Sequence, residues 1–271
     1  MAVSSEPSLP PQTLASAEPV NTKDRCRLFG LSGWPLIAAL IVLQLALLMV
    51  GGTIVPLPEG VPANYVWDDW WFRGLLLAVT ATLAWFSRIP MHRSNRVPRI
   101  ALLLIVPLAV MLVGDLLSIS AGVTRGDLIV FTLIGGAFVG IDEELFFRGL
   151  ILNILGERFS AAKSVLISMV LFSVSHIGGG AGDMVLPIFM GFGLGWVYVM
   201  SGRNLWLVCG LHALFDIAQS LPTLTVTPEQ PLTMGGVVLM LLGCVTLTIV
   251  GFRTWRDRRL DGTAMGAGVA R

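Results

Sequence analysis

Apolar residues run along most of this chain in long stretches, separated by short polar segments. A helix needs roughly 20 mostly apolar residues to cross a bilayer, and eight stretches approach that length, the fifth to seventh being short or interrupted by polar groups. They cover about Trp34–Val55, Trp67–Ser87, Arg99–Ile119, Leu128–Ile154, Ala162–Ile177, Met184–Met200, Leu205–Leu221 and Gly235–Phe252. The pattern predicts an all-α, polytopic transmembrane helix bundle of about eight spans.

Polar segments flank this apolar region at both ends. Residues 1–33 are rich in Pro, Ser, Ala and Glu, a composition typical of a disordered tail, and they lack the apolar core of a signal peptide. Residues 253–271 are short and basic. We therefore expect a disordered cytosolic N-terminal tail (1–33), a transmembrane domain (34–252) and a basic cytosolic C-terminal tail (253–271).

The composition predicts a membrane protein, and the placement of charged residues predicts its orientation. The chain is 55% hydrophobic and 13% charged, whereas a soluble domain is about a quarter charged, so we expect a multi-pass protein of the cell membrane. Of the predicted loops, those on the side opposite the termini hold only Arg73 and Arg125. Because Lys and Arg concentrate in cytoplasmic loops, the sequence predicts N-in, C-in topology. The basic residues on the side of the termini are Lys23, Arg25, Arg27, Arg88, Arg93, Arg96, Arg99, Arg158, Lys163, Arg203, Arg253, Arg256, Arg258, Arg259 and Arg271.

The fourth stretch contains an acidic triplet. Each acidic side chain at mid-bilayer costs roughly 2.5–3.5 kcal/mol, so we expect Glu143 and Glu144 to have a function. Glu144 and Arg148 share a helix face and can pair, while Glu143 is rotated by about 100 degrees and can act elsewhere. Asp142 is either a third catalytic acid or a solvated acid that lines the same wet cavity.

Two further stretches carry ionisable side chains. His176 lies one helical turn after Phe172, and His212 lies four residues before Asp216. The His212/Asp216 pair lines up on one helix face, where it can hold a water, bind a metal or orient a carbonyl oxygen. The alternative is a His–Asp hydrogen bond that satisfies both groups inside the bundle.

A count of helical rise predicts the depth of these groups. At 1.5 Å per residue, His212 and Asp216 come out near mid-membrane, Glu143 nearer the cytosolic side and His176 at or beyond the middle. The predicted offset between Glu143 and His176 is about 10 Å, which indicates a cavity that opens to the cytosol.

Small residues form two stripes in the predicted spans. Gly136-x-x-x-Gly140 lies in the fourth, and Gly191-x-Gly193-x-Gly195 in the sixth. Such stripes let helices approach closely in lipid, so a packing role is predicted, with a helix hinge as the lesser alternative.

The three motifs together resemble the CPBP family of intramembrane endopeptidases, which includes CAAX prenyl proteases and bacteriocin-processing, Abi-like proteins. The family pattern is Glu-Glu-x-x-x-Arg, then Phe-x-x-x-His, then His-x-x-x-Asn/Asp on successive transmembrane helices. The matching residues are Glu143-Glu144-Leu-Phe-Phe-Arg148, Phe172-Ser-Val-Ser-His176 and His212-Ala-Leu-Phe-Asp216. The resemblance covers roughly residues 128–220, which would form the catalytic core.

The resemblance implies a role for each motif residue. Glu143 would activate a water with help from His176, and Arg148 would fix Glu144. His212 and Asp216 would stabilise the oxyanion or bind the same centre. The prenyl-protease branch typically has Asn where this chain has Asp216, and an ionised carboxylate would repel an oxyanion. Asp216 must therefore be protonated, orient His212 or bind a metal.

The resemblance leaves the catalytic type and the cofactor open. Glu143, His176, His212 and Asp216 would be an acceptable zinc ligand set, so a divalent metal is a candidate cofactor beside a metal-free glutamate mechanism. As partners we expect the lipid bilayer and a membrane-associated peptide or protein substrate, and no nucleic acid.

Two rival functions stay open: a non-proteolytic immunity or scaffold protein of the same fold, and an ion- or proton-coupled transporter.

Overall fold

The computed structural model describes residues 31, 33–54, 69–87, 89–124, 126–177, 184–226 and 231–267. Within these ranges the chain is helical, with short connecting segments and no strand elements, and Val123 and Thr225 form an isolated β-bridge. The predicted all-α class is therefore confirmed. The predicted disordered tail lies outside the described residues, except for positions 31 and 33.

The helices follow the predicted apolar stretches. They are α1 (Trp34–Ile54), α2 (Asp69–Ser87), α3 (Leu102–Ala121), α4 (Ile129–Glu144), the π-helix η4 (Leu145–Ile151), α5 (Leu152–Gly156), α6 (Ala161–Val174), α7 (Val185–Met200), α8 (Leu205–Ser220) and α9 (Pro231–Ala267). The predicted fourth span is one helical run from α4 through η4 to α5. α9 continues through residues 253–267, where the tail was expected; this segment lacks proline and includes four helix-forming Arg residues.

Several helices suit a membrane by length and composition. Among the described residues, three helical segments are long and apolar enough to cross one: Arg99–Ala121, Leu205–Leu224 and Pro231–Arg256. Shorter apolar helices are Trp34–Gln44, Gly74–Ser87, Ala161–Val174 and Val185–Met200. The eight-span count and the N-in, C-in topology stay predictions.

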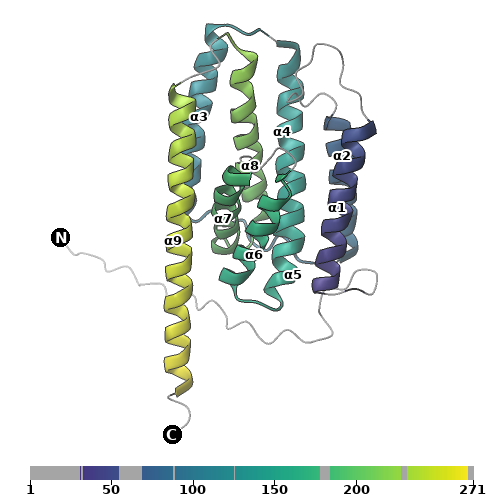
Figure 1. Ribbon diagram of the computed structural model, residues 1–271. Coiled ribbons are helices and arrows are strands. Elements are labelled where there is room, and N and C mark those ends of the chain that lie inside the picture. Colours follow the sequence, from purple (N-terminus) through teal and green to yellow (C-terminus); the bar gives the residue numbers. More distant parts are fainter. Residues whose placement is uncertain are drawn as a thin grey trace, which may run out of the picture.

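The bundle is built around α4 and α8, which lie side by side (Figure 1). α9 packs along α3 and α7, and α2 packs against α4. α6 and α7 contact each other and stop well short of the upper ends of α4 and α8 in Figure 1. Their 14 and 16 residues give lengths of roughly 21 and 24 Å, less than a hydrocarbon core of about 30 Å. The predicted fifth and sixth stretches thus form a short helical pair.

Glycine permits the close contact between α4 and α8. A Cβ atom on Gly136 would lie 2.7 Å from Cγ1 of Ile217, and one on Gly140 would lie 2.6 Å from Cα of Ala213. Both distances are too short for a real side chain, so the predicted packing role is confirmed. The glycines of α7 also face other helices: Gly191 faces Met169, Gly193 faces Cys244 and Gly195 faces Val165.

A matched pair of alanine substitutions tests this contact. Gly140→Ala should destabilise the protein by about 1–3 kcal/mol, because the methyl group would push against the backbone of α8. Gly210→Ala adds the same methyl where no atom lies within 4 Å, and it should stabilise the helix by up to about 1 kcal/mol. Denaturant titration in detergent micelles measures both. Equal effects of the two substitutions would contradict the packing role.

Candidate active site

An ion pair at the end of α4 links three helices. Nη1 of Arg148 lies 2.5 Å from Oε1 of Glu144, and both side chains are almost fully buried. Nη2 of Arg148 donates to the carbonyls of Met190 and Gly191 on α7, and its guanidinium carbon lies 4.7 Å from the centre of the Phe172 ring on α6. The predicted i,i+4 pair is present, and it also holds α6 and α7 against α4.

Glu144 fixes the orientation of a histidine from α8. Nδ1 of His212 lies 2.8 Å from Oε1 of Glu144, the same oxygen that accepts from Arg148. Because a carboxylate oxygen only accepts, the Nδ1–H of the imidazole is the donor. This contact joins residues 68 positions apart, and no sequence pattern predicted it.

Glu143 points toward two histidines. Its Oε2 lies 3.8 Å from Nε2 of His176 and 3.8 Å from Nε2 of His212. Nδ1 of His176 lies 2.8 Å from the carbonyl of Phe172, so Nδ1–H donates there. The neutral His176 ring therefore presents an acceptor, Nε2, toward Glu143.

The offset predicted between Glu143 and His176 was wrong, because their side chains lie 3.8 Å apart. Glu143 and His176 each lie roughly 20 Å of helical rise from the end of the bundle where α5 meets α6, namely from Gly156 and Ala161. The two residues therefore lie at the same level of the bundle. Their depth in a membrane stays a prediction.

Asp216 lies one turn from His212 on α8, as its spacing predicted. Its Oδ2 is 3.7 Å from Nε2 of His212, which is too long for a direct hydrogen bond. The simple alternative of a His–Asp hydrogen bond is therefore not formed. The six predicted site residues, Glu143, Glu144, Arg148, His176, His212 and Asp216, thus lie in one cluster, and their catalytic roles stay predictions.

Asp142 faces a different part of the bundle. Its side chain is fully buried, and Nε2 of Gln44 on α1 donates to its Oδ2 at 3.5 Å. It is therefore not a solvated acid, in contrast to one of the two interpretations of its sequence position. Gln44 connects α1 to the acidic triplet, and its place in an otherwise apolar stretch is the only sequence signal that could have indicated this.

The donor atoms suggested for a metal lie slightly farther apart than zinc ligands do. Tetrahedral zinc ligands 2.0–2.1 Å from the ion lie roughly 3.3 Å apart, whereas the pairs Glu143–His176, Glu143–His212 and His212–Asp216 lie 3.7–3.8 Å apart. Among the described residues, no group of three or more His, Cys, Asp or Glu side chains is arranged to hold a metal ion. No step below depends on such an ion, and the divalent metal stays a prediction.

An asparagine stabilises the π-helix behind the site. Nδ2 of Asn153 donates to the carbonyls of Arg148 and Gly149 and to the hydroxyl of Tyr198. Tyr198 in turn donates to the carbonyl of Met91. A π-helix shifts the regular hydrogen-bond register and often occurs at functional sites, so these bonds hold the wider turn that positions Arg148. Sequence inspection missed Asn153.

Removing this amide should destabilise the fold. Asn153→Leu leaves buried acceptors on the π-helix without their donor, which should lower the free energy of unfolding by about 1–3 kcal/mol. Thr246→Val is the control, because that hydroxyl bonds only its own exposed helix face, and it should change stability by less than about 0.5 kcal/mol. Thermal unfolding in detergent compares them, and a stable Asn153→Leu protein would contradict the assigned support.

A pocket of about 370 Å³ lies beside the two histidines. One wall is apolar and the other carries ionisable and amide groups. This combination is typical of a site that binds a mostly apolar ligand and orients it with a few polar groups. The lining residues are Phe172, His176, Leu186, Pro187, Met190, His212, Phe215, Asp216 and Gln219.

Comparison with known proteins addresses the same segment. Residues 125–218, about a third of the chain, match the model of a family described as type II CAAX prenyl endopeptidase Rce1-like. The matched segment contains all three motifs. A search of the curated proteins gives no match. The resemblance predicted from the motifs is thereby confirmed: residues 125–218 carry the Rce1-like pattern of the CAAX protease family.

Proposed function

We propose that the chain is an intramembrane endopeptidase that hydrolyses a peptide bond of a membrane-associated substrate, either lipidated or amphipathic. One observation carries this proposal: Oε2 of Glu143 lies 3.8 Å from Nε2 of both His176 and His212, and both rings line a pocket. The family match supports peptide hydrolysis as the reaction class.

Glu143 acts as the general base. Its carboxylate oxygen and Nε2 of neutral His176 are two acceptors 3.8 Å apart, a spacing that suits a water donating to both. Glu143 takes a proton from this water while the water oxygen attacks the peptide carbonyl, and His176 orients the water. The proton then passes from Glu143 to the leaving nitrogen as the C–N bond breaks, which gives a carboxylic acid and an amine.

His212 stabilises the developing oxyanion. Glu144 holds its Nδ1–H and Arg148 holds Glu144, so the ring is fixed with Nε2 toward the reaction site. Protonated at Nε2, the ring donates to the oxyanion, and one such donor contributes about a hundredfold to a thousandfold in kcat. Asp216, 3.7 Å from Nε2, balances the charge of the protonated ring.

Cleavage by the purified protein tests this proposal. The protein is incubated in detergent with farnesylated and unmodified amphipathic peptides, with and without a chelator, and mass spectrometry identifies the products. We expect cleavage that persists in the chelator. Cleavage that the chelator abolishes and zinc restores would contradict the metal-free mechanism. A folded protein that cleaves none of the peptides would favour an immunity or scaffold protein, and ion flux in proteoliposomes would favour a transporter.

A further inference from the structure

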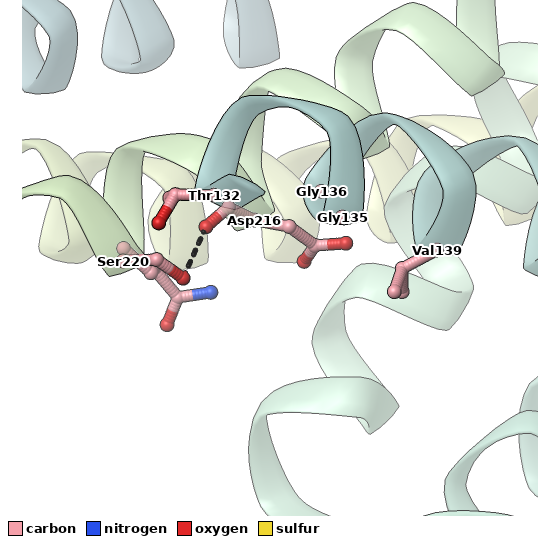
Figure 2. Close-up of a pocket in the computed structure, with 7 residues that line it drawn as sticks. Thr132, Gly135, Gly136, Val139, Asp216 and Ser220 are labelled. Carbon is pink, nitrogen blue, oxygen red and sulfur yellow. Dashed lines mark hydrogen bonds between the residues drawn. The ribbon is translucent and has the colours of Figure 1, made fainter. Parts of the chain in front are cut away.

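A second cavity lies in the seam between α4 and α8, with a volume of about 190 Å³. Figure 2 shows the carboxylate of Asp216 in this cavity, between Thr132 and Val139 and alongside the α4 backbone. Asp216 and Gln219 line both this cavity and the larger pocket beside the histidines. The two cavities are therefore neighbours, with these two side chains in the lining of both. The lining residues are Thr132, Gly135, Gly136, Val139, Asp216, Gln219 and Ser220.

The helix periodicity explains why the seam leads to the reaction site. Thr132, Gly136 and Val139 follow one face of α4 in steps of three or four residues, and the next steps reach Glu143. Gly135 and Gly136 place the α4 backbone itself in the lining of the seam. The seam therefore lies along the face of α4 that also carries Glu143.

The charges around these cavities do not balance when both histidines are neutral. The buried carboxylates of Glu143 and Glu144, together with Asp216, lie near one guanidinium, that of Arg148. When ionised they leave an excess of two negative charges if His176 and His212 are neutral, and none if both are protonated. No Lys or Arg is among the residues that line either cavity.

A positively charged ligand would relieve this imbalance, because an ionised carboxylate in a membrane interior is costly. The polar lining of the seam also suits a cation. The carboxylate of Asp216, the amide oxygen of Gln219 and the hydroxyl of Thr132 are all acceptors. The volume exceeds the roughly 150 Å³ of a cavity that holds a benzene molecule, so a long basic side chain fits.

We propose that the α4/α8 seam is a substrate subsite for a Lys or Arg side chain, with Asp216 as the residue that determines the specificity. The inference rests on the proposed endopeptidase function and names the class of residue that the substrate carries near its scissile bond. A neutral side chain of the same length would bind more weakly, and an acidic one would be repelled.

Peptide binding tests the subsite without relying on cleavage. Fluorescent amphipathic peptides with Lys, norleucine or Glu at one scanned position are titrated onto the Glu143→Gln protein in the presence of a chelator. At one position, Lys should bind about tenfold tighter than norleucine, the size of one charge-assisted hydrogen bond. Adding Asp216→Asn should bring that ratio close to one. Adding Gln219→Lys should reverse the preference toward Glu.

A control separates the subsite from general effects of removing a carboxylate. Asp115 is a buried acid between α3 and α9, where Thr233 donates to it, and Asp115→Asn should leave the Lys preference intact. Equal binding of Lys and norleucine at every position, or a preference that survives Asp216→Asn, overturns the subsite. Wild-type protein that shows the Lys preference but cleaves no peptide would contradict the proposed hydrolysis without contradicting the subsite.

Discussion

Replacing Glu143 by glutamine should reduce peptide hydrolysis by at least about a hundredfold to ten-thousandfold, the usual contribution of a general base. The amide keeps the shape of the side chain but does not accept a proton from water at neutral pH. The carboxylate is 3.8 Å from both histidines and is not the partner of Arg148, so the helix bundle should stay folded. Initial rates on a cleaved peptide and the thermal unfolding midpoint measure the two effects.

The same Asp115→Asn substitution serves as the control for this loss. Asp115 is a buried acid like Glu143, but it lies between α3 and α9. Its amide variant should hydrolyse peptides at nearly the wild-type rate. A Glu143→Gln protein that is folded and equally active would show that another group activates the water.

Replacing Arg148 by methionine should destabilise the protein by about 3–5 kcal/mol, the cost of leaving a buried charge without its partner. Glu144 would keep only its contact with His212, and the carbonyls of Met190 and Gly191 would lose their donor. Activity should fall as well, because the orientation of His212 depends on Glu144. Denaturant titration in mixed micelles measures the free energy of unfolding.

Two companion variants separate charge from packing. Adding Glu144→Gln to Arg148→Met removes the uncompensated charge and should recover part of the lost stability. Arg148→Lys should recover little, because a single ammonium does not reproduce the planar set of donors that reaches both α4 and α7. Full stability of Arg148→Lys would contradict the role given to the guanidinium.

Contacts within one helix could be predicted from the sequence. The spacing of Glu144 and Arg148 gave their ion pair, and the glycine spacing in α4 gave its close contact with α8. Both follow from the fixed geometry of a helix, in which residues three and four apart share a face. The length of the apolar stretches gave the helices, within a few residues at most ends, but α9 continues to Ala267 beyond the predicted end at Phe252.

Contacts between helices could not be predicted in this way. Periodicity shows which residues share a face but not which helix that face meets, so the contacts of Glu144 with His212 and of Gln44 with Asp142 were missed. The offset predicted between Glu143 and His176 was wrong because a count of helical rise does not show how neighbouring helices are aligned along the bundle. Asn153 was missed because a π-helix has no simple sequence pattern.

In the proposed mechanism Glu143 directs water to a peptide carbonyl. Mass spectrometry of products formed in water labelled with the heavy isotope of oxygen tests this role. We predict that wild-type protein, with chelator present, places one labelled oxygen in the new carboxyl terminus of a cleaved peptide, and that Glu143→Gln forms no such product. Labelled product at equal rates from both folded proteins, or product without the label, would contradict it.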